Sequence, residues 1–258
     1  MAQLTIVGLG PARPEMITVE AQTALREALS SNARVYGLAH AREVVKSVEP
    51  GLPIRSLDYL YSLPDVSRPM AYRDLADMLV RRVQDDNLDV VYVVAGSPLF
   101  INDAVLRIRE RCAMDSVGYR LIHGVSFLDL ILDRVYWTGW AGLQMYSAWN
   151  IARDGMTLSM SSPAVLFQLG EFSAGGDALD ESGSTGMLVE VRDALLETYP
   201  EDHPVIVLYS SGRPEYRSMA RSIPLCELAS QPVPVYSNLW IPSADGPNIE
   251  RQMAPELA

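Results

Sequence analysis

Apolar and polar residues alternate in blocks along the first half of the chain, and their spacing predicts alternating strands and helices. Short runs of branched apolar residues are typical of buried strands, whereas apolar residues every three or four positions are typical of amphipathic helices. The expected elements are strand 4–8, helix 17–29, strand 33–38, helices 40–48 and 70–85, strand 89–95, helix 102–114, strand 118–123 and helix 126–134. This alternation predicts an α/β fold with a mostly parallel sheet.

After Gly139 the pattern changes to shorter strand-like pieces. The expected elements there are strands Leu143–Ala148 and Ala164–Leu169, a glycine- and serine-rich loop over 174–186, a helix over 187–198, and strands Val205–Tyr209 and Pro234–Ile241. We therefore expect a second lobe with a mixed sheet. The predicted domains are an N-terminal α/β lobe at 1–138, a C-terminal α/β lobe at 139–243 and a short tail at 244–258.

Three expected strands of the first lobe end in glycine-containing turns. Strand 4–8 leads into Gly-Leu-Gly-Pro, strand 89–95 into Gly-Ser-Pro, and strand 118–123 into Gly-Val-Ser. Ligands of open α/β sheets bind outside the carboxyl ends of the strands, so we expect these turns to border one ligand crevice. Pro11 and Pro14 distinguish the first turn from a dinucleotide-binding fingerprint, which continues into its helix with a third glycine.

Charge and composition disfavour several classes of protein. A net charge of −11 and a pI near 4.7 disfavour nucleic acid as a partner. No run of about 18 apolar residues and no signal-peptide pattern is present, so we expect a cytoplasmic protein without a membrane segment. No metal is expected, because the spacing of a zinc site is absent from the cysteines and histidines, which are Cys112, Cys226, His40, His123 and His203.

The order of the three turns resembles that of the tetrapyrrole methylase superfamily of S-adenosylmethionine-dependent methyltransferases. The usual motifs of that superfamily read GxGPG, GDPxxF and PGVS. Ala12 and Ser97 depart from these motifs, and both departures disfavour a porphyrin-type substrate. The resemblance implies two lobes with the cofactor, S-adenosyl-L-methionine, in the cleft between them, and it implies a homodimer.

Residues of both lobes are expected to bind this cofactor. Gln168 is a candidate from its own chemistry, since a glutamine in an otherwise apolar strand needs hydrogen-bond partners that a ligand can supply. Aromatic residues next to the turns could instead be ordinary core residues. The expected cofactor-binding residues are Gly96, Ser97, Leu99, Phe100, Ile101, Ser126, Phe127, Gln168, Tyr209, Ser210 and Asn238.

The segment from Asp58 to Tyr72 resembles the catalytic segment of the borosin peptide-backbone α-N-methyltransferases, in which a tyrosine precedes an Arg-x-x-x-Tyr pair. Here the pair is Arg68 and Tyr72, and the upstream tyrosine is Tyr61. Later segments of that family are similar to Val165–Leu169, Tyr199–Val207 and Leu239–Pro242. Because borosins often carry their substrate as a C-terminal extension and only a short tail follows here, the resemblance implies a separate, ribosomally made precursor peptide. A homodimer with two precursor chains would form a heterotetramer.

Methylation of a peptide nitrogen needs help, because the nitrogen lone pair is delocalised into the carbonyl group. A tyrosine phenol has a pKa near about 10, and a neighbouring guanidinium favours the phenolate, which would permit proton removal near neutral pH. Arg68 and Tyr72 lie on one face of a helix if that helix begins near Pro69. We expect Tyr72 or Tyr61 to be the general base, the other tyrosine to donate to the developing oxyanion, and Arg68 to tune both.

Other functions stay open from the sequence. The same cofactor could serve methylation of a tetrapyrrole, a small metabolite or ribosomal RNA, and net charge disfavours the RNA. A catalytically silent cofactor-binding scaffold would bind the ligand without turning over any peptide. An aromatic stretch containing Trp137, Trp140 and Trp149 belongs to the core or a dimer surface, or alternatively lines a peptide groove.

Overall fold

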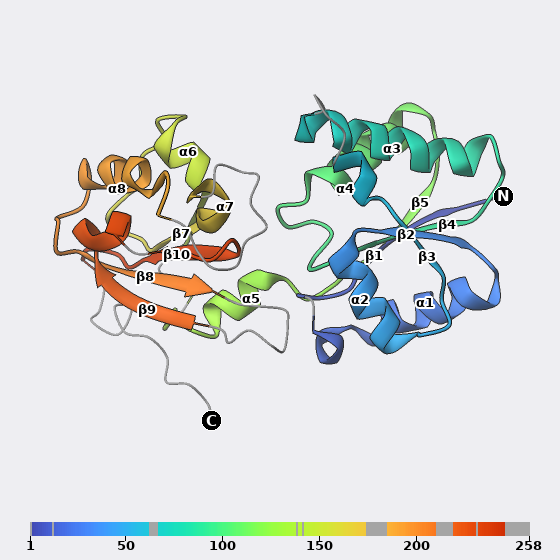
Figure 1. The fold of residues 1–258 in the computed structure, drawn as a ribbon, viewed down its shortest axis with the longest axis horizontal. Helices are drawn as coiled ribbons and strands as arrows, with labels where there is room; N and C mark the ends of the chain where they lie inside the picture. Colours follow the sequence, from blue (N-terminus) through green and yellow to red (C-terminus); the bar gives the residue numbers. More distant parts are fainter. Residues whose placement is uncertain are drawn as a thin grey trace. The chain divides into compact units, whose positions relative to one another are not determined.

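The chain forms two compact units in the computed structural model (Figure 1), Met1–Phe127 and Leu128–Ala258. The structure describes residues 2–11, 13–61, 67–137, 139–140, 142–173, 185–209, 219–230 and 232–245. The division lies upstream of the lobe boundary that the sequence suggested at residue 138. Each unit has its own five-stranded sheet, so the α/β fold with two sheets expected from the sequence is confirmed.

The first unit contains an all-parallel sheet with strand order β3-β2-β4-β1-β5. Its strands are β1 (Leu4–Gly8), β2 (Arg34–Gly37), β3 (Ile54–Ser56), β4 (Val90–Val94) and β5 (Tyr119–Ile122). Every residue of β4 is buried, because this central strand is covered on both faces. The continuous apolar run that predicted this strand is therefore a consequence of its position in the sheet.

Helices cover both faces of this sheet, as Figure 1 shows. Successive residues of β1 point to opposite faces. Leu4 and Ile6 pack with α3 (Arg68–Gln84) and α4 (Asp103–Met114). Val7, and Leu9 just after the strand, pack with α1 (Val19–Ser30) and α2 (Ala39–Val48). The unit also contains the short 3₁₀ helices η1 (Pro14–Met16) and η2 (Asp58–Tyr61).

The second unit contains a mixed sheet with strand order β6-β7-β10-β8-β9. β6 and β7 are parallel, and the other pairs are antiparallel. Its strands are β6 (Gln144–Ser147), β7 (Ala164–Phe167), β8 (Pro204–Tyr209), β9 (Met219–Pro224) and β10 (Ser237–Ile241). Its helices are α6 (Ala148–Ala152), α7 (Leu169–Ser173), α8 (Leu188–Leu196) and η3 (Leu225–Ser230), and α5 (Phe127–Leu132) begins at the unit boundary. Residues of these helices and of the sheet form one apolar cluster.

The long, strongly patterned elements were predicted to within a few residues, and some of the short ones were missed. β3, β9, α6 and α7 have no counterpart among the predictions. The strand expected to end at Leu169 ends at Phe167, because Gln168 has a positive φ of 60° and turns the chain into α7. Only part of the expected loop 174–186 and of the expected tail 244–258 falls within the described residues.

Gly170 in α7 lies against the backbone that precedes β10, and we expect Gly170→Ala to destabilise the protein. A Cβ atom there would lie 1.9 Å from the carbonyl oxygen of Pro234 and 2.4 Å from that of Val235. Overpacking of this kind costs about 3 kcal/mol, against about 1 kcal/mol gained from the better helix propensity of alanine. The net loss of about 2 kcal/mol corresponds to a fall in Tm of about 4–8 °C.

Gly118→Ala is the matched control for a thermal unfolding scan, because a Cβ atom at Gly118 meets nothing within 4 Å. We expect its Tm to stay within about 1–2 °C of the parental value, as for a surface substitution that changes stability by less than about 0.5 kcal/mol. Equal Tm values for the two alanine variants would contradict the packing of α7 against this segment.

Candidate functional site

The three glycine turns meet at one edge of the first sheet, as expected from the sequence. β4, β1 and β5 are neighbouring parallel strands, so their carboxyl ends lie side by side. The backbone nitrogen of Gly96 donates a hydrogen bond to the carbonyl oxygen of Gly10 at 2.6 Å. A Cβ atom on Gly124 would lie 2.5 Å from the oxygen of Gly96 and 2.7 Å from the carbonyl carbon of Gly8. Only glycine therefore permits this approach of three backbones.

The turn after β4 has the geometry of a ligand-binding loop. Gly96 has a φ of +76°, and a Cβ atom there would meet nothing within 4 Å, so the space beside this turn is open. Ile101 has a φ of 48°, a conformation that is strained for a β-branched residue and that is found preferentially at functional sites. Leu99 and Ile101 are 51% and 46% exposed. Open space, backbone polar groups and exposed apolar side chains suit a ligand with polar and apolar parts.

Two further expected cofactor residues lie close to one another in this unit. The rings of Phe100 and Phe127 pack with centroids 5.2 Å apart. The hydroxyl of Ser97 accepts a hydrogen bond from the backbone nitrogen of Leu99 at 3.3 Å, which stabilises the turn. The structure therefore brings together the candidate residues of the first unit from Gly96 to Ile101 with Phe127.

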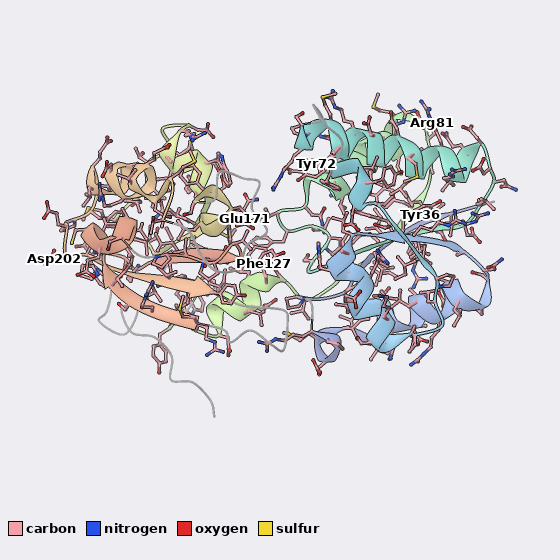
Figure 2. All side chains as sticks on the ribbon, viewed as in Figure 1. Tyr36, Tyr72, Arg81, Phe127, Glu171 and Asp202 are labelled. Atoms are coloured by element: carbon pink, nitrogen blue, oxygen red, sulfur yellow. The ribbon has the colours of Figure 1, made fainter. Side chains whose placement is uncertain are left out.

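The three predicted catalytic residues form a cluster at the start of α3. The helix begins at Arg68, close to the expected position at Pro69, so Arg68 and Tyr72 are one turn apart on one face. The Arg68 side chain donates a hydrogen bond to the Tyr72 hydroxyl. The rings of Tyr61 and Tyr72 meet edge to face with centroids 5.9 Å apart. Figure 2 shows Tyr72 at the beginning of α3.

The expected lowering of the phenol pKa does not occur. Burial raises the pKa of Tyr72 above its usual value, and the opposing effect of Arg68 is smaller. Burial and the neighbouring Tyr72 raise the pKa of Tyr61 strongly, again against a smaller effect of Arg68. Both phenols are therefore neutral at neutral pH, because the loss of solvation outweighs the guanidinium charge. Tyr72, which has the hydrogen bond from Arg68, carries the better stabilised phenolate.

Sequence reasoning missed two neighbours of this tyrosine pair. Asp103, the first residue of α4, raises the pKa of Tyr72 through its charge. Tyr92 is 1% exposed, and burial raises its pKa, with further contributions from Tyr61 and Tyr72. An apolar strand pattern gives no sign that one of its residues lies behind a polar cluster, so only the fold could identify Tyr92.

The second unit brings together two of its candidate residues. The backbone nitrogen of Gln168 donates a hydrogen bond to Oδ1 of Asn238 at 3.4 Å. Tyr209 ends β8 and is paired with Ser237, the residue before Asn238. The positive φ of Gln168 is a second strained backbone position among the candidates. Ser210 lies outside the described residues.

The three tryptophans have different environments. Trp149 belongs to the core of the second unit, where its ring meets Phe172 edge to face at 5.0 Å. Nε1 of Trp137 donates a hydrogen bond to the carbonyl oxygen of Gly142 at 2.9 Å. Trp140 is 96% exposed. Core packing therefore accounts for Trp149, and Trp140 is a surface residue of this unit.

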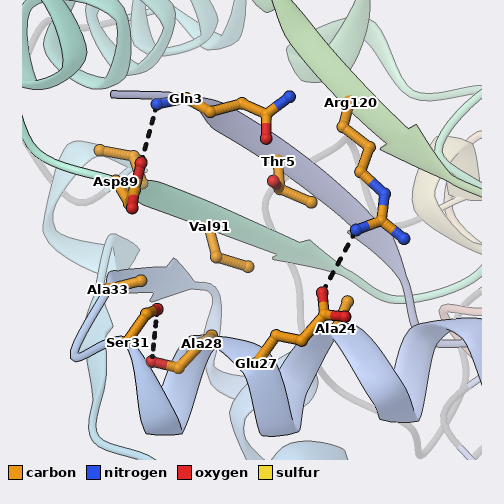
Figure 3. A pocket seen from close by; sticks show the side chains of 11 residues that line it. Gln3, Thr5, Ala24, Glu27, Ala28, Ser31, Ala33, Asp89, Val91 and Arg120 are labelled. Carbon is orange, nitrogen blue, oxygen red and sulfur yellow. Dashed lines mark hydrogen bonds and ion pairs between the residues drawn. The ribbon is translucent and has the colours of Figure 1, made fainter. Parts of the chain in front are cut away.

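A cavity of about 160 Å³ lies at the other edge of the first sheet, away from the glycine turns (Figure 3). Glu27, Asp89 and Arg120 are among its lining residues, and Arg120 Nη1 lies 3.3 Å from Glu27 Oε2. Pockets for small molecules usually have volumes of about 300–1,000 Å³. The cavity is too small for a nucleoside cofactor and contains no catalytic candidate, so the glycine turns remain the candidate ligand site.

The described residues contain neither a membrane-spanning helix nor a group of metal ligands. In the part of the chain that the structure describes, no helix is long and apolar enough to span a membrane. Over the same residues, no three or more histidine, cysteine, aspartate or glutamate side chains are grouped so that they could bind a metal ion.

In this α/β protein, glycine turns follow the carboxyl ends of neighbouring parallel strands. This edge of the sheet is where open α/β sheets typically bind ligands. The model of the family of tetrapyrrole (corrin/porphyrin) methylases matches residues 3–223, and the chain belongs to that family. Membership in this family makes methyl transfer from S-adenosylmethionine the first activity to test. This match identifies the family and does not identify the borosin subtype that residues 58–72 suggested.

One curated relative is an uncharacterized protein, YabN, from Bacillus subtilis (strain 168), which is 25% identical over 226 residues. The match covers 88% of this chain, and the chain spans only 42% of the length of that protein. The relative therefore adds neither an activity nor a family assignment.

Solved structures of similar fold include a cobalt precorrin-4 methyltransferase, CbiF, with a TM-score of 0.61, and a uroporphyrin-III-C-methyltransferase from Thermus thermophilus, with a TM-score of 0.64. The methyltransferase CobJ gives a TM-score of 0.60. Each is 14% identical, and the matches cover 94–99% of this chain and 95–100% of those chains. At this identity the likeness shows the fold alone.

Proposed function

We propose that this protein transfers methyl groups from S-adenosylmethionine to backbone amide nitrogens of a separate precursor peptide. The observation that carries the proposal is the cluster of Arg68, Tyr72 and Tyr61, which combines a hydrogen-bonded Arg-Tyr pair with a second phenol in edge-to-face contact. Such a cluster can both accept a proton and stabilise an oxyanion, the two tasks that methylation of an amide requires.

The roles of the two tyrosines follow from their environments. Tyr72 is the base, because the hydrogen bond and charge of Arg68 favour its phenolate. Tyr61, whose pKa is raised strongly, keeps its proton and donates a hydrogen bond to the amide oxygen of the substrate. The amide proton moves to the Tyr72 oxygen, and negative charge develops on the amide oxygen beside Tyr61. Asp103 raises the pKa of Tyr72 through its charge, which makes the Tyr72 phenolate a stronger base for the amide proton.

The glycine turns fit the cofactor. The open space beside Gly96 and the exposed apolar side chains of Leu99 and Ile101 would hold its nucleoside and methionine parts, with Ser97, Phe100, Ser126 and Phe127 around them. When bound, S-adenosylmethionine supplies an electrophilic methyl group. The protein groups hold it, exclude water and deprotonate the acceptor.

Addition of S-adenosylmethionine is expected to stabilise the protein against thermal unfolding. A ligand present at 100 times its Kd and bound only to the folded state contributes about 2.7 kcal/mol, which a thermal scan detects readily. Gly124→Ala is expected to abolish the shift, because its Cβ atom would lie 2.5 Å from the Gly96 oxygen and displace the turn. A folded parental protein whose Tm is unchanged at millimolar S-adenosylmethionine would contradict the proposed cofactor site.

The proposed peptide substrate can be sought by co-expression with any small protein that a neighbouring open reading frame encodes. Each transfer adds about 14 Da, the mass of CH₂, to the intact mass of that peptide. We expect a ladder of such increments with the parental protein and none with Tyr72→Phe. An unchanged peptide mass with a stable, S-adenosylmethionine-binding enzyme would count against a peptide substrate.

The family itself favours a second candidate, methylation of a tetrapyrrole, since its description names corrin and porphyrin methylases. Conversion of uroporphyrinogen III under conditions that leave the peptide unmodified would support it. Homodimer formation stays a prediction, and the exposed Trp140 and the 46% exposed Met145 are apolar groups that such a contact would cover.

A further inference from the structure

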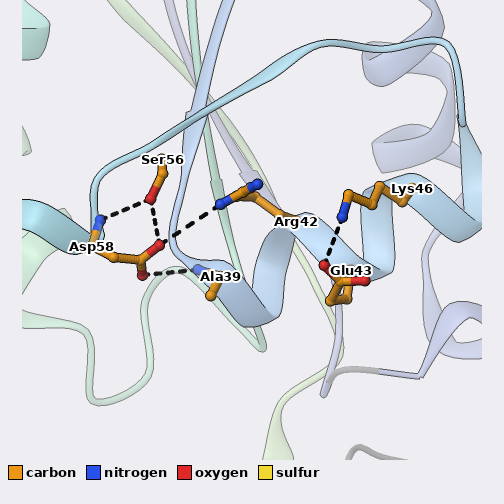
Figure 4. A network of polar contacts seen from close by, with 6 residues as sticks. All are labelled: Ala39, Arg42, Glu43, Lys46, Ser56 and Asp58. Atoms are coloured by element: carbon orange, nitrogen blue, oxygen red, sulfur yellow. Dashed lines mark hydrogen bonds and ion pairs between the residues drawn. The ribbon is translucent and has the colours of Figure 1, made fainter.

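The Asp58 carboxylate connects η2, the turn that contains Tyr61, to the start of α2 through hydrogen bonds (Figure 4). Its Oδ1 accepts a hydrogen bond from the backbone nitrogen of Ala39 at 3.0 Å. Its Oδ2 accepts a hydrogen bond from the Ser56 hydroxyl and lies 3.9 Å from Nη1 of Arg42. The Ser56 hydroxyl oxygen in turn accepts from the backbone nitrogen of Asp58 at 3.1 Å. One carboxylate thus links the end of β3, the turn η2 and the first residue of α2.

The carboxylate also replaces a missing helix cap. Leu38, at the N-cap position of α2, provides no side-chain hydrogen bond. The first nitrogens of a helix lack intrahelical partners and favour negative charge, so an Asp58 oxygen at the Ala39 nitrogen satisfies both needs. The ion pair with Arg42 is long and partly exposed and contributes little. The hydrogen bond from the Ala39 nitrogen, rather than the ion pair, is therefore the main link between Asp58 and α2.

Tyr61 is the last residue of the same turn, so its position depends on how the turn is held. The backbone nitrogen of Leu57 donates to the oxygen of Gly37 at 3.1 Å, and that of Leu60 donates to the oxygen of Leu57 at 3.1 Å. Leu57 and Leu60 are 1% and 7% exposed. Leu57 and Leu60 therefore bury the apolar side of η2, and Asp58 bonds the same turn to the start of α2.

We propose that Asp58 is a positioning residue whose carboxylate holds η2 against α2 so that Tyr61 meets Tyr72 edge to face. This inference rests on the proposed function, in which Tyr61 donates a hydrogen bond to the substrate amide oxygen. Asp58 itself touches neither substrate nor cofactor in this proposal. Its removal changes the orientation of a reacting group, and displacement of a catalytic group by about 1 Å can lower a rate by about 10²-fold.

The test compares Asp58→Ala, Asp58→Asn and a control variant in single-turnover methylation of the co-expressed peptide. We expect Asp58→Ala to lower the rate constant by about 10²-fold, with the KM for peptide and the Kd for S-adenosylmethionine within about twofold of the parental values. Asp58→Asn keeps an oxygen for the Ala39 nitrogen and is expected to restore most of the rate. Glu43→Gln is the control, since Glu43 also lies on α2 and pairs with Lys46 at 2.9 Å.

Hydrogen exchange of residues 56–61 gives a readout that does not depend on the substrate. We expect faster exchange in Asp58→Ala and parental exchange in Glu43→Gln. If Asp58→Ala does not fold, Ser56→Ala removes one contact and is expected to change rate and exchange in the same directions. Parental exchange in a folded Asp58→Ala or Ser56→Ala variant, or a loss of cofactor binding equal to the loss of rate, would overturn the proposal. Absence of parental activity on any peptide would instead reject the proposed function, and exchange would still decide whether Asp58 anchors the turn.

Discussion

Replacement of Tyr72 by phenylalanine is expected to lower the rate of methyl transfer by about 10²–10⁴, the usual effect of removing a general base. The substitution deletes only the hydroxyl, so the edge-to-face contact with Tyr61 and the packing of α3 persist. The Kd for S-adenosylmethionine is expected to stay within about twofold, because Tyr72 lies on α3 and the proposed cofactor turn follows β4. Single-turnover rates and calorimetric binding measure the two effects separately.

Tyr119→Phe is a matched control for this prediction. The hydroxyl of Tyr119 accepts a hydrogen bond from Nε of Arg109 at 3.0 Å, so this residue is also half of an Arg-Tyr pair. Tyr119 begins β5, at the edge of the sheet away from the glycine turns. We expect its rate to match that of the parental protein. A Tyr72→Phe variant that methylates the peptide as fast as Tyr119→Phe would show that the Arg68–Tyr72 pair has only a structural role.

The rate of methyl transfer is expected to rise about tenfold per pH unit between about pH 7 and 9, a change of about 10² overall. The base acts as the phenolate, and the pKa of Tyr72 lies above its usual value near about 10 because of burial. Below that pKa the phenolate fraction increases tenfold with each unit of pH. Single-turnover rates over this interval measure the slope, provided that far-ultraviolet circular dichroism shows an unchanged fold.

Variants that leave Tyr72 in place are expected to change the rate of methyl transfer but not its slope with pH. Tyr61→Phe should be slower but keep the slope, since the base is intact. Arg68→Ala should keep the slope with a lower rate at every pH, because removal of the guanidinium raises the pKa of Tyr72 further. A parental rate that is independent of pH from 7 to 9 would contradict proton removal by Tyr72.

Sequence patterns predicted most of the first unit, because its central strands are buried on both faces and its helices are long. β4 is entirely buried, and the Thr18 side chain caps the N-terminus of α1 by accepting a hydrogen bond from the Ala21 nitrogen. Two edge strands gave no comparable signal. β3 has three residues and none is buried, and β9 contains Arg221 and Ser222 within an edge strand paired only to β8. The edge strands β5 and β6, each paired to one neighbour, were predicted, so β3 was missed because it is short and β9 because adjacent polar residues interrupt its apolar pattern.

The candidate site was predicted as a set of residue types, and its electrostatics required the fold. The i, i+4 spacing of Arg68 and Tyr72 correctly indicated a shared helix face. The direction of the phenol pKa was predicted wrongly, because burial by residues distant in sequence, including Tyr92 on β4, was not visible in the local pattern. The same holds for Asp58, whose partners Ala39 and Ser56 lie on α2 and β3.

Location of the transferred methyl group by tandem mass spectrometry tests the central claim most directly. The purified protein is incubated with S-adenosylmethionine and the peptide from the neighbouring open reading frame, and uroporphyrinogen III is offered in a parallel reaction. The prediction is a methyl group on backbone amide nitrogens of the peptide, no conversion of the tetrapyrrole, and loss of the modification in Tyr72→Phe. A methyl group on a side chain of the peptide, or methylation of uroporphyrinogen III with the peptide unmodified, would contradict the assignment of a backbone N-methyltransferase.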